Sequence, residues 1–350
     1  MTGSPLPSSM RAVALTGVGG PEVLAVERRP VPRPEAGQFL VRVAACGVCG
    51  HDLLARRGAL TAGVGTVLGH EIAGTVVALG PGTPPKWRDQ PVALVQRLPC
   101  GDCPDCAAGR TTHCRRGPGF YGDDQPGGYA EYVLASPLNA VPLPEEVDPV
   151  EGALLSCAVG TGLRALRTAE VRPGEVVVVT GAGGGVGLHT VRTARHLGAT
   201  VLAVTGSPSK AADLRAEGAD AVLVAPDRAA LREELRRLGR PRGAEVAVEV
   251  TGAPTFRTVL RALAPGGRLV LVGNTEPATL PLDPGLVIVK ELRVLGSAHA
   301  DRSDLERVVE LARSGAVTPV AARRWTLEET AGAHRAVENR EVTGRAVVVP

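Results

Sequence analysis

The chain has 350 residues, of which 44% are hydrophobic and only 2% aromatic, and its 39 basic and 36 acidic residues leave a formal net charge of +3. This length and composition predict a globular protein with room for two domains, whose cores are built from Ala, Val and Leu. Mixed charges of nearly equal number give no reason to expect nucleic acid or a membrane surface as a partner. No apolar run is long enough to span a membrane, and the first ten residues lack the apolar core of a signal peptide, so we expect a cytoplasmic protein.

Residues 11–45 indicate strands broken by Gly and Pro, which is typical of an irregular β-domain. The chain then carries the first of seven cysteines, at positions 46, 49, 100, 103, 106, 114 and 157. The number is odd and no secretion signal precedes them, so metal binding explains them better than disulfides do.

Three residues of metal-ligand type are spread through the first half of the chain: Cys49, His70 and Cys157. A catalytic zinc is commonly held by three such ligands, with a fourth position left for water or substrate. Spacing alone does not bring these three together, and it leaves open that the cysteines are inert core thiols and that the histidine is a buried, hydrogen-bonded one.

A second set is compact. Cys100, Cys103, Cys106 and Cys114 lie within one short polar loop, at about 97–116, that also contains Gly101, Pro104 and Gly109. Four thiolates complete a tetrahedral structural zinc with no open position, and the metal would stabilise a loop that has no core of its own. His113 is a weaker competing ligand, because four thiolates are already available.

The middle of the chain indicates a βαβ unit. A helix from about Glu151 carries Cys157 and continues through Thr168, and the domain boundary falls near 158–170. Val176–Val179 is a buried-strand pattern, Val186–Leu197 has helical spacing up to Gly198, and Thr200–Thr205 is a second strand. Between the first strand and the helix lies a turn with five glycines, at 181, 183, 184, 185 and 187.

This turn predicts a dinucleotide site. Glycines let the backbone approach a pyrophosphate, and the following helix directs unpaired N–H groups at the phosphates. The expected phosphate-binding residues are Gly183, Gly184, Gly185, Val186 and Gly187, with Ala182 at the first position of a G-x-G-x-x-G variant.

The end of the second strand favours NADP(H) over NAD(H). An NAD site usually has an Asp or Glu there for the ribose 2′-hydroxyl, whereas this chain has Thr205 and Ser207, with Lys210 close by and no carboxylate before Asp213. A small, uncharged pocket flanked by lysine suits a 2′-phosphate. Taken alone, Lys210 is equally consistent with a solvated lysine at the start of a helix.

Strands and helices then alternate up to about residue 295, which predicts a doubly wound parallel sheet with its ligand at the carboxyl ends of the strands. Thr251 and Gly273 follow two of these strands and would line the cofactor crevice, unless they are ordinary turn residues. Residues 318–350 have no place in this sheet, so we expect them to rejoin the first domain.

Taken together, these motifs resemble the zinc-containing medium-chain dehydrogenase/reductases of the alcohol dehydrogenase superfamily. The likeness covers nearly the whole chain and rests on CGVCGHD, GHEIAGTVVALG, the four-cysteine loop, LLSCAVGTG with GAGGGVG, and AHRAVENREVTGRAVVVP. The resemblance implies a GroES-like β-rich catalytic domain at 1–160, a Rossmann domain at 161–297, and a return to the catalytic domain at 298–350.

The resemblance also implies ligands and assembly. It assigns Cys49, His70 and Cys157 to a catalytic zinc and makes Glu71 an exchangeable or outer ligand. It assigns the four-cysteine loop to a structural zinc, which gives two zinc ions per subunit, and leaves Cys46 as a core thiol. Members of the family are homodimers or homotetramers.

Position 51 departs from the family pattern. Alcohol dehydrogenases usually have Ser or Thr two residues after the first zinc cysteine, and this chain has His51. The stretches TGAPTF, VGN and VIVKELRVLGSAHA resemble acryloyl-coenzyme A reductases, which also lack that hydroxyl and use NADPH. We therefore expect hydride transfer to the β-carbon of an α,β-unsaturated carbonyl or thioester. The alternative is an aldehyde or ketone reductase with His51 as proton relay, and a non-catalytic NADP(H)-binding relative is a minor third possibility.

Overall fold

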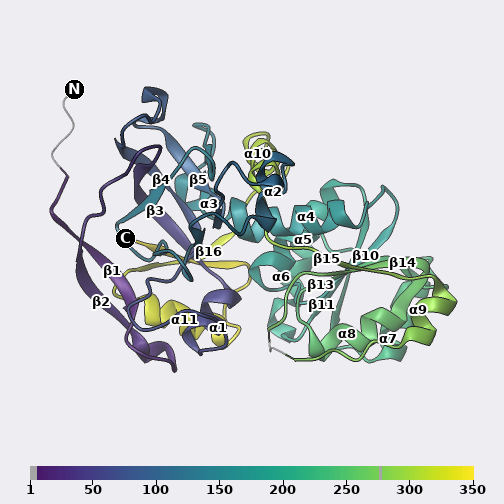
Figure 1. Cartoon of the computed structure of the whole chain (residues 1–350). Coiled ribbons are helices and arrows are strands. Elements are labelled where there is room, and N and C mark those ends of the chain that lie inside the picture. Colours follow the sequence, from purple (N-terminus) through teal and green to yellow (C-terminus); the bar gives the residue numbers. More distant parts are fainter. Residues whose placement is uncertain (1–5, 276–277) are drawn as a thin grey trace. The chain divides into compact units, whose positions relative to one another are not determined.

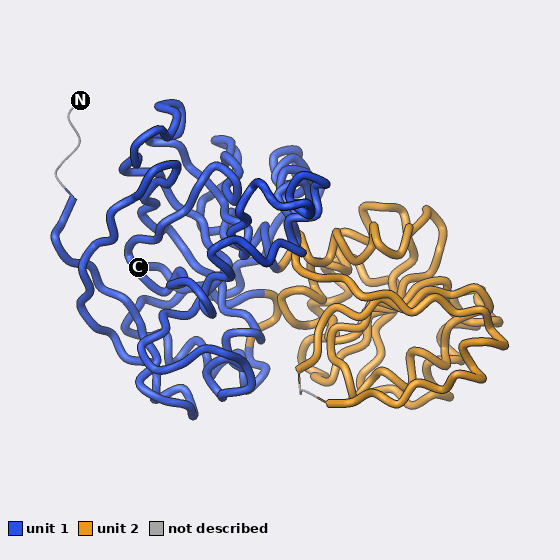
Figure 2. Tube along the Cα trace, in the orientation of Figure 1, with its two compact units in different colours: residues 1–157, 300–341, 345–350 blue, residues 158–299, 342–344 orange. Residues whose placement is uncertain are grey.

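The computed structural model describes residues 6–275 and 278–350. It divides into two compact units, shown in blue and orange in Figure 2. Unit 1 contains the chain up to Cys157 together with Ala300–Glu341 and Arg345–Pro350. Unit 2 contains Ala158–His299 and the short segment Val342–Gly344. The segment after residue 300 therefore lies mainly in unit 1.

Unit 2 is built on a six-stranded parallel sheet, in the order β12-β11-β10-β13-β14-β15. The doubly wound parallel sheet expected from the sequence is thus confirmed, because this is the order of the dinucleotide-binding fold. The central run of four valines is completely buried, as a strand covered on both faces requires. The strands are β10 (Val176–Val179), β11 (Thr200–Thr205), β12 (Ala221–Val224), β13 (Ala244–Glu249), β14 (Leu263–Leu271) and β15 (Arg293–Gly296).

Helices cover both faces of this sheet. In Figure 1, α4 and α5 lie on one side of it and α7 and α8 on the other. The leucines of α7 and the apolar residues of α8 join the buried valines of the sheet in one hydrophobic core. The helices are α4 (Gly160–Thr168), α5 (Gly185–His196), α6 (Ala211–Ala216), α7 (Arg228–Arg237), α8 (Ala253–Ala262) and α9 (Pro284–Lys290).

Two boundaries differ from the sequence prediction. The sequence pattern predicts a helix at Thr255–Ala264 that is ended by Pro265, but α8 ends at Ala262 and β14 begins at Leu263, whose side chain is fully buried in the core and which pairs with Ala244 of β13. The helix expected from Glu151 to Thr168 is divided into α3 (Pro149–Gly152), a π-helical turn at Leu155–Val159, and α4. Single π turns of this kind are frequent at functional sites.

Unit 1 is β-rich. Its main sheet has the strand order β16-β17-β3-β4-β5-β9, with β8 also paired to β3, and β1 pairs separately with β2. Strands β16 and β17 come from the end of the chain, and β17 pairs antiparallel with β3. The strands are β1 (Ser9–Leu15), β2 (Leu24–Pro30), β3 (Phe39–Val48), β4 (Glu71–Leu79), β5 (Pro91–Leu94), β8 (Tyr132–Ala135), β9 (Ala140–Pro142), β16 (Ala321–Thr326) and β17 (Arg345–Val349).

The remaining elements of unit 1 are short or peripheral. They are α1 (Gly50–Arg56), α2 (Pro104–Ala107), the two-residue strands β6 (Arg97–Leu98) and β7 (Gly119–Phe120), α10 (Arg302–Arg313) and α11 (Thr330–Glu338). None of the helices in the described residues combines the length and the apolar character needed to cross a membrane.

The glycine turn gives a direct test of the packing in unit 2. A Cβ atom on Gly187 would lie 2.2 Å from the carbonyl oxygen of Gly181, so Gly187→Ala should push α5 away from β10 and lower the free energy of unfolding by about 1–3 kcal/mol. Gly296→Ala is the matched control in the same unit, because its Cβ would meet nothing within 4 Å. We expect that control to stay within about 0.5 kcal/mol of the parent chain. Equal unfolding midpoints for the two variants in denaturant titrations would contradict the prediction.

Candidate active site

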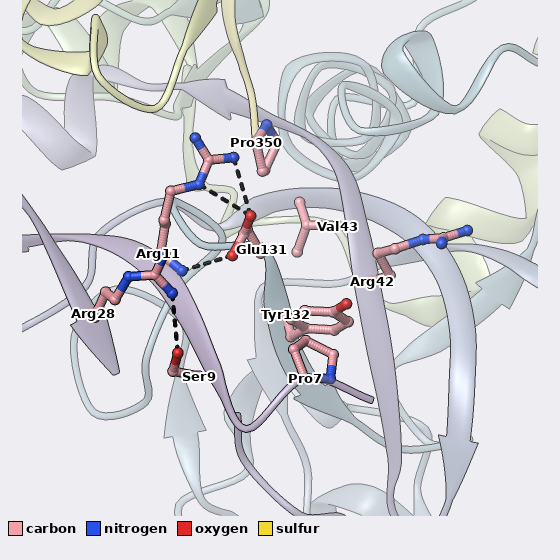
Figure 3. Close-up of a pocket in the computed structure, with 9 residues that line it drawn as sticks. All are labelled: Pro7, Ser9, Arg11, Arg28, Arg42, Val43, Glu131, Tyr132 and Pro350. Atoms are coloured by element: carbon pink, nitrogen blue, oxygen red, sulfur yellow. Dashed lines mark hydrogen bonds and ion pairs between the residues drawn. The ribbon is translucent and has the colours of Figure 1, made fainter. Parts of the chain in front are cut away.

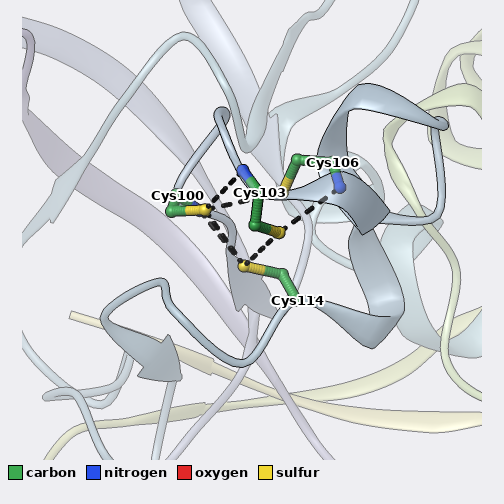
Figure 4. Close-up of side chains that lie close together, drawn as sticks. All are labelled: Cys100, Cys103, Cys106 and Cys114. Atoms are coloured by element: carbon green, nitrogen blue, oxygen red, sulfur yellow. Dashed lines mark hydrogen bonds between the residues drawn. The ribbon is translucent and has the colours of Figure 1, made fainter.

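The four cysteines of the loop after β6 lie around one point (Figure 4). The Sγ–Sγ distances are 3.9 Å for Cys100–Cys106, 3.9 Å for Cys103–Cys114 and 3.6 Å for Cys100–Cys114. A tetrahedral zinc with Zn–S bonds of about 2.3 Å requires sulfur atoms about 3.8 Å apart. A disulfide would require about 2.05 Å. The spacing therefore fits a shared metal ion and not a disulfide pair.

The backbone of the loop prepares the sulfur atoms for this role. The N–H groups of Cys100, Cys103 and Cys106 donate to the sulfur atoms of Cys114, Cys100 and Cys103, at 3.3–3.5 Å. Burial opposes ionisation of Cys114, but the amide groups of Cys100 and Arg116 lower the pKa of its thiol to about 6. His113 is not in the cluster of ligand atoms found among the described residues. These four cysteines could hold a structural zinc.

A second group of candidate ligands forms where three elements meet. Cys49 is the residue before α1, His70 and Glu71 stand at the start of β4, and Cys157 lies in the π-helical turn. One ligand atom from each of these four residues lies within 4.8 Å of the other three. The fold thus brings together residues that are scattered in the sequence.

Two glycines make room for this arrangement. Gly69, just before His70, has φ +93°, and a Cβ there would lie 2.6 Å from the Cys46 sulfur and 2.7 Å from the Tyr129 ring. Gly47 pairs with Glu71 across β3 and β4, and its Cβ would lie 2.1 Å from a Glu71 carboxylate oxygen. Side chains at these two positions would displace His70 and Glu71.

The two thiols of this site are in hydrogen-bond contact. Their sulfur atoms are 4.0 Å apart. The hydrogen bond from Cys157, together with Arg345 and His70, holds the pKa of Cys49 well below its usual range despite burial. The same contact raises the pKa of Cys157. Cys49 is therefore the thiol that ionises more readily, and a soft cation would stabilise both sulfur atoms as thiolates.

Asp52 orients His70. The Nδ1 atom of His70 lies 3.1 Å from Asp52 Oδ1, and both side chains are buried. A carboxylate accepts here, so Nδ1 carries a proton and Nε2 is the nitrogen that would bind a metal in place of its own proton. Burial disfavours the charged form of His70, but Asp52 and Cys49 outweigh it and raise its pKa. Asp52 is not among the residues that the sequence predicts for this site, although its place three residues after Cys49 is a usable signal.

Glu71 is paired with a residue from the last strand. Arg345 Nη2 on β17 lies 2.8 Å from Glu71 Oε1, and both side chains are buried. This is a contact of charges only, because neither carboxylate oxygen of Glu71 has a hydrogen-bond partner within the described residues. Burial raises the pKa of Glu71 to about 7 even though Arg345 opposes the shift. Nothing in the sequence signalled that Arg345 would reach this site.

The donor set fits zinc. Two thiol sulfurs, one imidazole nitrogen and an orphaned carboxylate oxygen are the ligand types that Zn²⁺ takes in catalytic sites. Cys49, His70 and Cys157 could hold the ion, and Glu71 is near enough to serve as a fourth or exchangeable ligand.

His51 stands beside this group on α1. Its ring centre is 5.2 Å from that of His70, and Phe120 packs against both rings. His51 Nε2 lies 3.0 Å from Asp123 Oδ2, in an ion pair that is partly exposed. Asp123 is a second residue that the sequence analysis missed, because nothing in its local sequence connects it with position 51.

The predicted cofactor residues of unit 2 gather at the glycine turn after β10. Gly184 caps α5 without a side chain, so no side-chain acceptor competes for the N–H groups of its first turn. Gly183, Gly185, Val186 and Gly187 form the remainder of the turn and the first turn of α5.

A Cβ on Gly181 would lie 3.0 Å from Thr251 Oγ1, which places Thr251 beside the turn. Gly273 follows β14 and packs on Val250, since its Cβ would lie 2.4 Å from that carbonyl oxygen. This open helix end fits a dinucleotide pyrophosphate.

Lys210 also packs on the turn. Its ammonium donates to the carbonyl oxygens of Gly183, at 3.1 Å, and of Val342. The side chain is only 7% exposed, so the alternative of a solvated lysine is wrong. Thr205 ends β11, and its hydroxyl oxygen accepts from the Ser207 N–H at 3.2 Å. The end of β11 thus presents a hydroxyl, and a fixed cation lies at the turn.

A separate cavity of about 350 Å³ opens on unit 1 (Figure 3). It is lined by Pro7, Ser9, Arg11, Arg28, Arg42, Val43, Glu131, Tyr132 and Pro350. None of the predicted site residues lines it. Arg11 is already paired with Glu131 at 3.0 Å, and Arg28 donates to Ser9.

Comparison with known proteins gives two family matches. Residues 35–145 match the alcohol dehydrogenase GroES-like domain, and residues 185–314 match the zinc-binding dehydrogenase family. The first match lies within the catalytic domain expected from the sequence, and the second begins at Gly185, near the end of the glycine turn.

Individual relatives match over nearly the full length. An acryloyl-coenzyme A reductase of Sulfurisphaera tokodaii is 31% identical over 329 residues, which cover 93% of this chain and 96% of that protein. An NAD-dependent alcohol dehydrogenase of the same organism is 31% identical over 359 residues, covering 97% and 100%. The crystal structure of AibC superposes with a TM-score of 0.90 at 42% identity, covering 98% of this chain and 96% of that one. The chain therefore belongs to the zinc-type medium-chain dehydrogenase/reductases, the oxidoreductases of the alcohol dehydrogenase superfamily.

Proposed function

We propose that this oxidoreductase uses NADP(H) and zinc to reduce the activated carbon–carbon double bond of an α,β-unsaturated carbonyl compound or thioester. The observation that carries the zinc dependence is the convergence of Cys49, His70, Glu71 and Cys157 on one point. With the four-cysteine cluster, the proposal gives two zinc ions per chain, one catalytic and one structural.

The residues of unit 1 would have separable roles. Cys49, His70 and Cys157 would hold the catalytic ion, which when bound supplies a Lewis acid for the substrate oxygen. Asp52 keeps the His70 lone pair directed away from the carboxylate. Arg345 restrains Glu71 beside the ligands and offsets its charge. Asp123 fixes the His51 ring at the edge of the group through Nε2, which would leave Nδ1 to exchange a proton with a substrate.

Reduction of a double bond is favoured over reduction of a carbonyl carbon by the residue at position 51. An imidazole paired with Asp123 stands where alcohol dehydrogenases usually have a hydroxyl. An acryloyl-coenzyme A reductase among the relatives supports the same direction. The second candidate is an aldehyde or ketone reductase in which His51 relays the proton, and the similarity to an alcohol dehydrogenase supports it.

The preference for NADP(H) rests on the end of β11. Thr205 and Ser207 offer hydroxyls and no carboxylate that would repel a 2′-phosphate. Lys210 adds a fixed positive charge at the glycine turn. A non-catalytic relative is disfavoured because such a protein would be expected to lose metal ligands, and this chain retains a full set in both clusters.

Metal analysis tests the first part of the proposal. The purified chain should contain about two zinc ions, and Cys49→Ala should retain about one and lose turnover while still binding NADPH. Cys46→Ala is the matched control, since Cys46 is a buried cysteine outside both clusters and should leave both ions in place. Turnover by Cys49→Ala, or full activity in the zinc-free protein, would show that the catalytic assignment is wrong.

Cofactor titration tests the second part. NADPH should bind more tightly than NADH, and Thr205→Asp should reverse the preference, with NADPH binding weakened by about tenfold or more because a carboxylate would then face the 2′-phosphate. The substituted Asp can accept the same Ser207 N–H, so β11 should still end as it does now. Fluorescence titration of both nucleotides provides the measurement. A parent chain that binds NADH as tightly as NADPH would refute the preference.

Substrate panels test the reaction. NADPH consumption by the zinc-loaded protein should occur with acryloyl, crotonyl and related unsaturated compounds, and mass spectrometry of the products should show that the double bond has been lost. Simple aldehydes and ketones form the second panel, and Cys49→Ala provides the blank for both. Turnover confined to aldehydes, with alcohol oxidation in reverse, would favour the second candidate instead.

A further inference from the structure

A chain of buried hydrogen bonds continues beyond Asp52, away from the candidate catalytic ligands. Tyr129 Oη donates to Asp52 Oδ2 at 3.1 Å, and His334 Nε2 lies 3.2 Å from Tyr129 Oη. Tyr129 and His334 are both 0% exposed, and their rings meet edge to face at 5.6 Å. Residues from α1, from the segment before β8 and from α11 therefore form one network that ends at His70.

The direction of each bond follows from the donors available. Tyr129 has one hydroxyl proton, which it donates in the hydrogen bond to the Asp52 carboxylate. The Tyr129 oxygen must therefore accept from His334 Nε2–H. Burial lowers the pKa of His334 to about 4, so the ring is neutral and carries a single N–H. Its Nδ1 has no partner within the described residues, as expected if the proton is on Nε2.

Asp52 is thereby held from three sides. Its Oδ1 faces His70 Nδ1, and its Oδ2 accepts from the Cys49 N–H at 2.8 Å and from Tyr129. A carboxylate with all these partners has one orientation, and that orientation determines how the His70 ring is turned. Without Tyr129, Oδ2 would retain only the amide of Cys49.

The backbone just before Tyr129 also lies against the residues that lead to His70. Gly127 and Gly128 donate to the carbonyl oxygens of Val67 and Gly69, at 2.7 and 2.8 Å. A Cβ on Gly127 would come within 2.2 Å of the Gly69 oxygen. The segment that carries Tyr129 is therefore in close contact with the strand entry that carries His70.

We propose that Tyr129 and His334 are positioning residues for the catalytic metal, which act through Asp52 to fix the orientation of His70. This inference rests on the proposed function, because it assumes that His70 is a metal ligand. The proposal gives α11 a part in retaining the ion, although this helix supplies none of the candidate ligands.

The test measures metal retention in the zinc-loaded full chain, independently of turnover. Tyr129→Phe and His334→Met remove the two donors, and His334→Gln restores an N–H near the position of Nε2. Tyr121→Phe is the matched control: Tyr121 is also buried, but its hydroxyl donates to the Leu134 carbonyl and accepts from Asn139. Zinc release to a chromogenic chelator is followed for each variant, and the four-cysteine site in the same molecule serves as an internal reference.

Tyr129→Phe should release the catalytic zinc about tenfold faster than the parent chain, with the structural zinc unaffected. His334→Met should act in the same direction by a smaller factor, and His334→Gln and Tyr121→Phe should remain at the parent rate. In the cobalt-substituted protein, the visible ligand-field bands should shift for Tyr129→Phe and His334→Met only. A general loss of stability would lower the unfolding temperature without moving these bands.

Unchanged release rates and cobalt spectra in both Tyr129→Phe and His334→Met would overturn this inference and leave the proposed function intact. If Tyr129→Phe does not fold, the zinc release rates and cobalt spectra of His334→Met and His334→Gln are compared instead. Equal values for these two variants would overturn the inference. A parent chain that holds only one zinc ion, resistant to the loss of Cys49, would overturn the proposed function and this inference with it.

Discussion

The candidate active site depends on the pairing of β3 with its two neighbours. β3 pairs with β4 so that Gly47 faces Glu71, and with β17 so that Val48 faces Ala346. This register places Cys49 just beyond one strand, His70 just before the next, and Arg345 at the start of the third. A shift of one residue in either pairing would turn Glu71 or Arg345 to the other face of the sheet. The backbone hydrogen bonds between these strands therefore hold the site residues in place more firmly than any single side-chain contact does.

The same pairing concentrates buried charge. Asp52, Glu71, His70 and Arg345 are all at most 5% exposed, and two thiols lie among them. Burying unpaired charges is costly, so each group needs a partner of opposite sign or a cation. Asp52 has His70 and Tyr129, and Glu71 has Arg345. The sulfur atoms of Cys49 and Cys157 lie 4.0 Å apart beside these pairs, and a divalent ion would stabilise both of them as thiolates.

Much of this arrangement could be predicted from the sequence, and the remainder could not for identifiable reasons. The βαβ unit and its glycine turn are local, so spacing and residue type were enough to define them. The four-cysteine loop is also local, and the structure brings its sulfur atoms to zinc-like distances. Cys49, His70 and Cys157 needed a family resemblance, because their proximity is created by sheet register and a π-helical turn. The places of Asp123, Arg345 and His334 at the site could not be predicted, since each reaches it from a distant part of the chain through contacts that only the fold creates.

The late position of β17 in the chain has a consequence for biosynthesis. The four-cysteine loop contains all its ligands within fifteen residues and needs no later part of the chain, so it can take up metal while the ribosome is still at work. The second centre is different, because Arg345 and the strand that supports it are synthesised long after Cys49, His70 and Cys157. Until then, the nascent chain holds Glu71 without its counter-charge. The two centres are therefore expected to mature in a fixed temporal order, with the loop first and the second centre only after β17 has been synthesised.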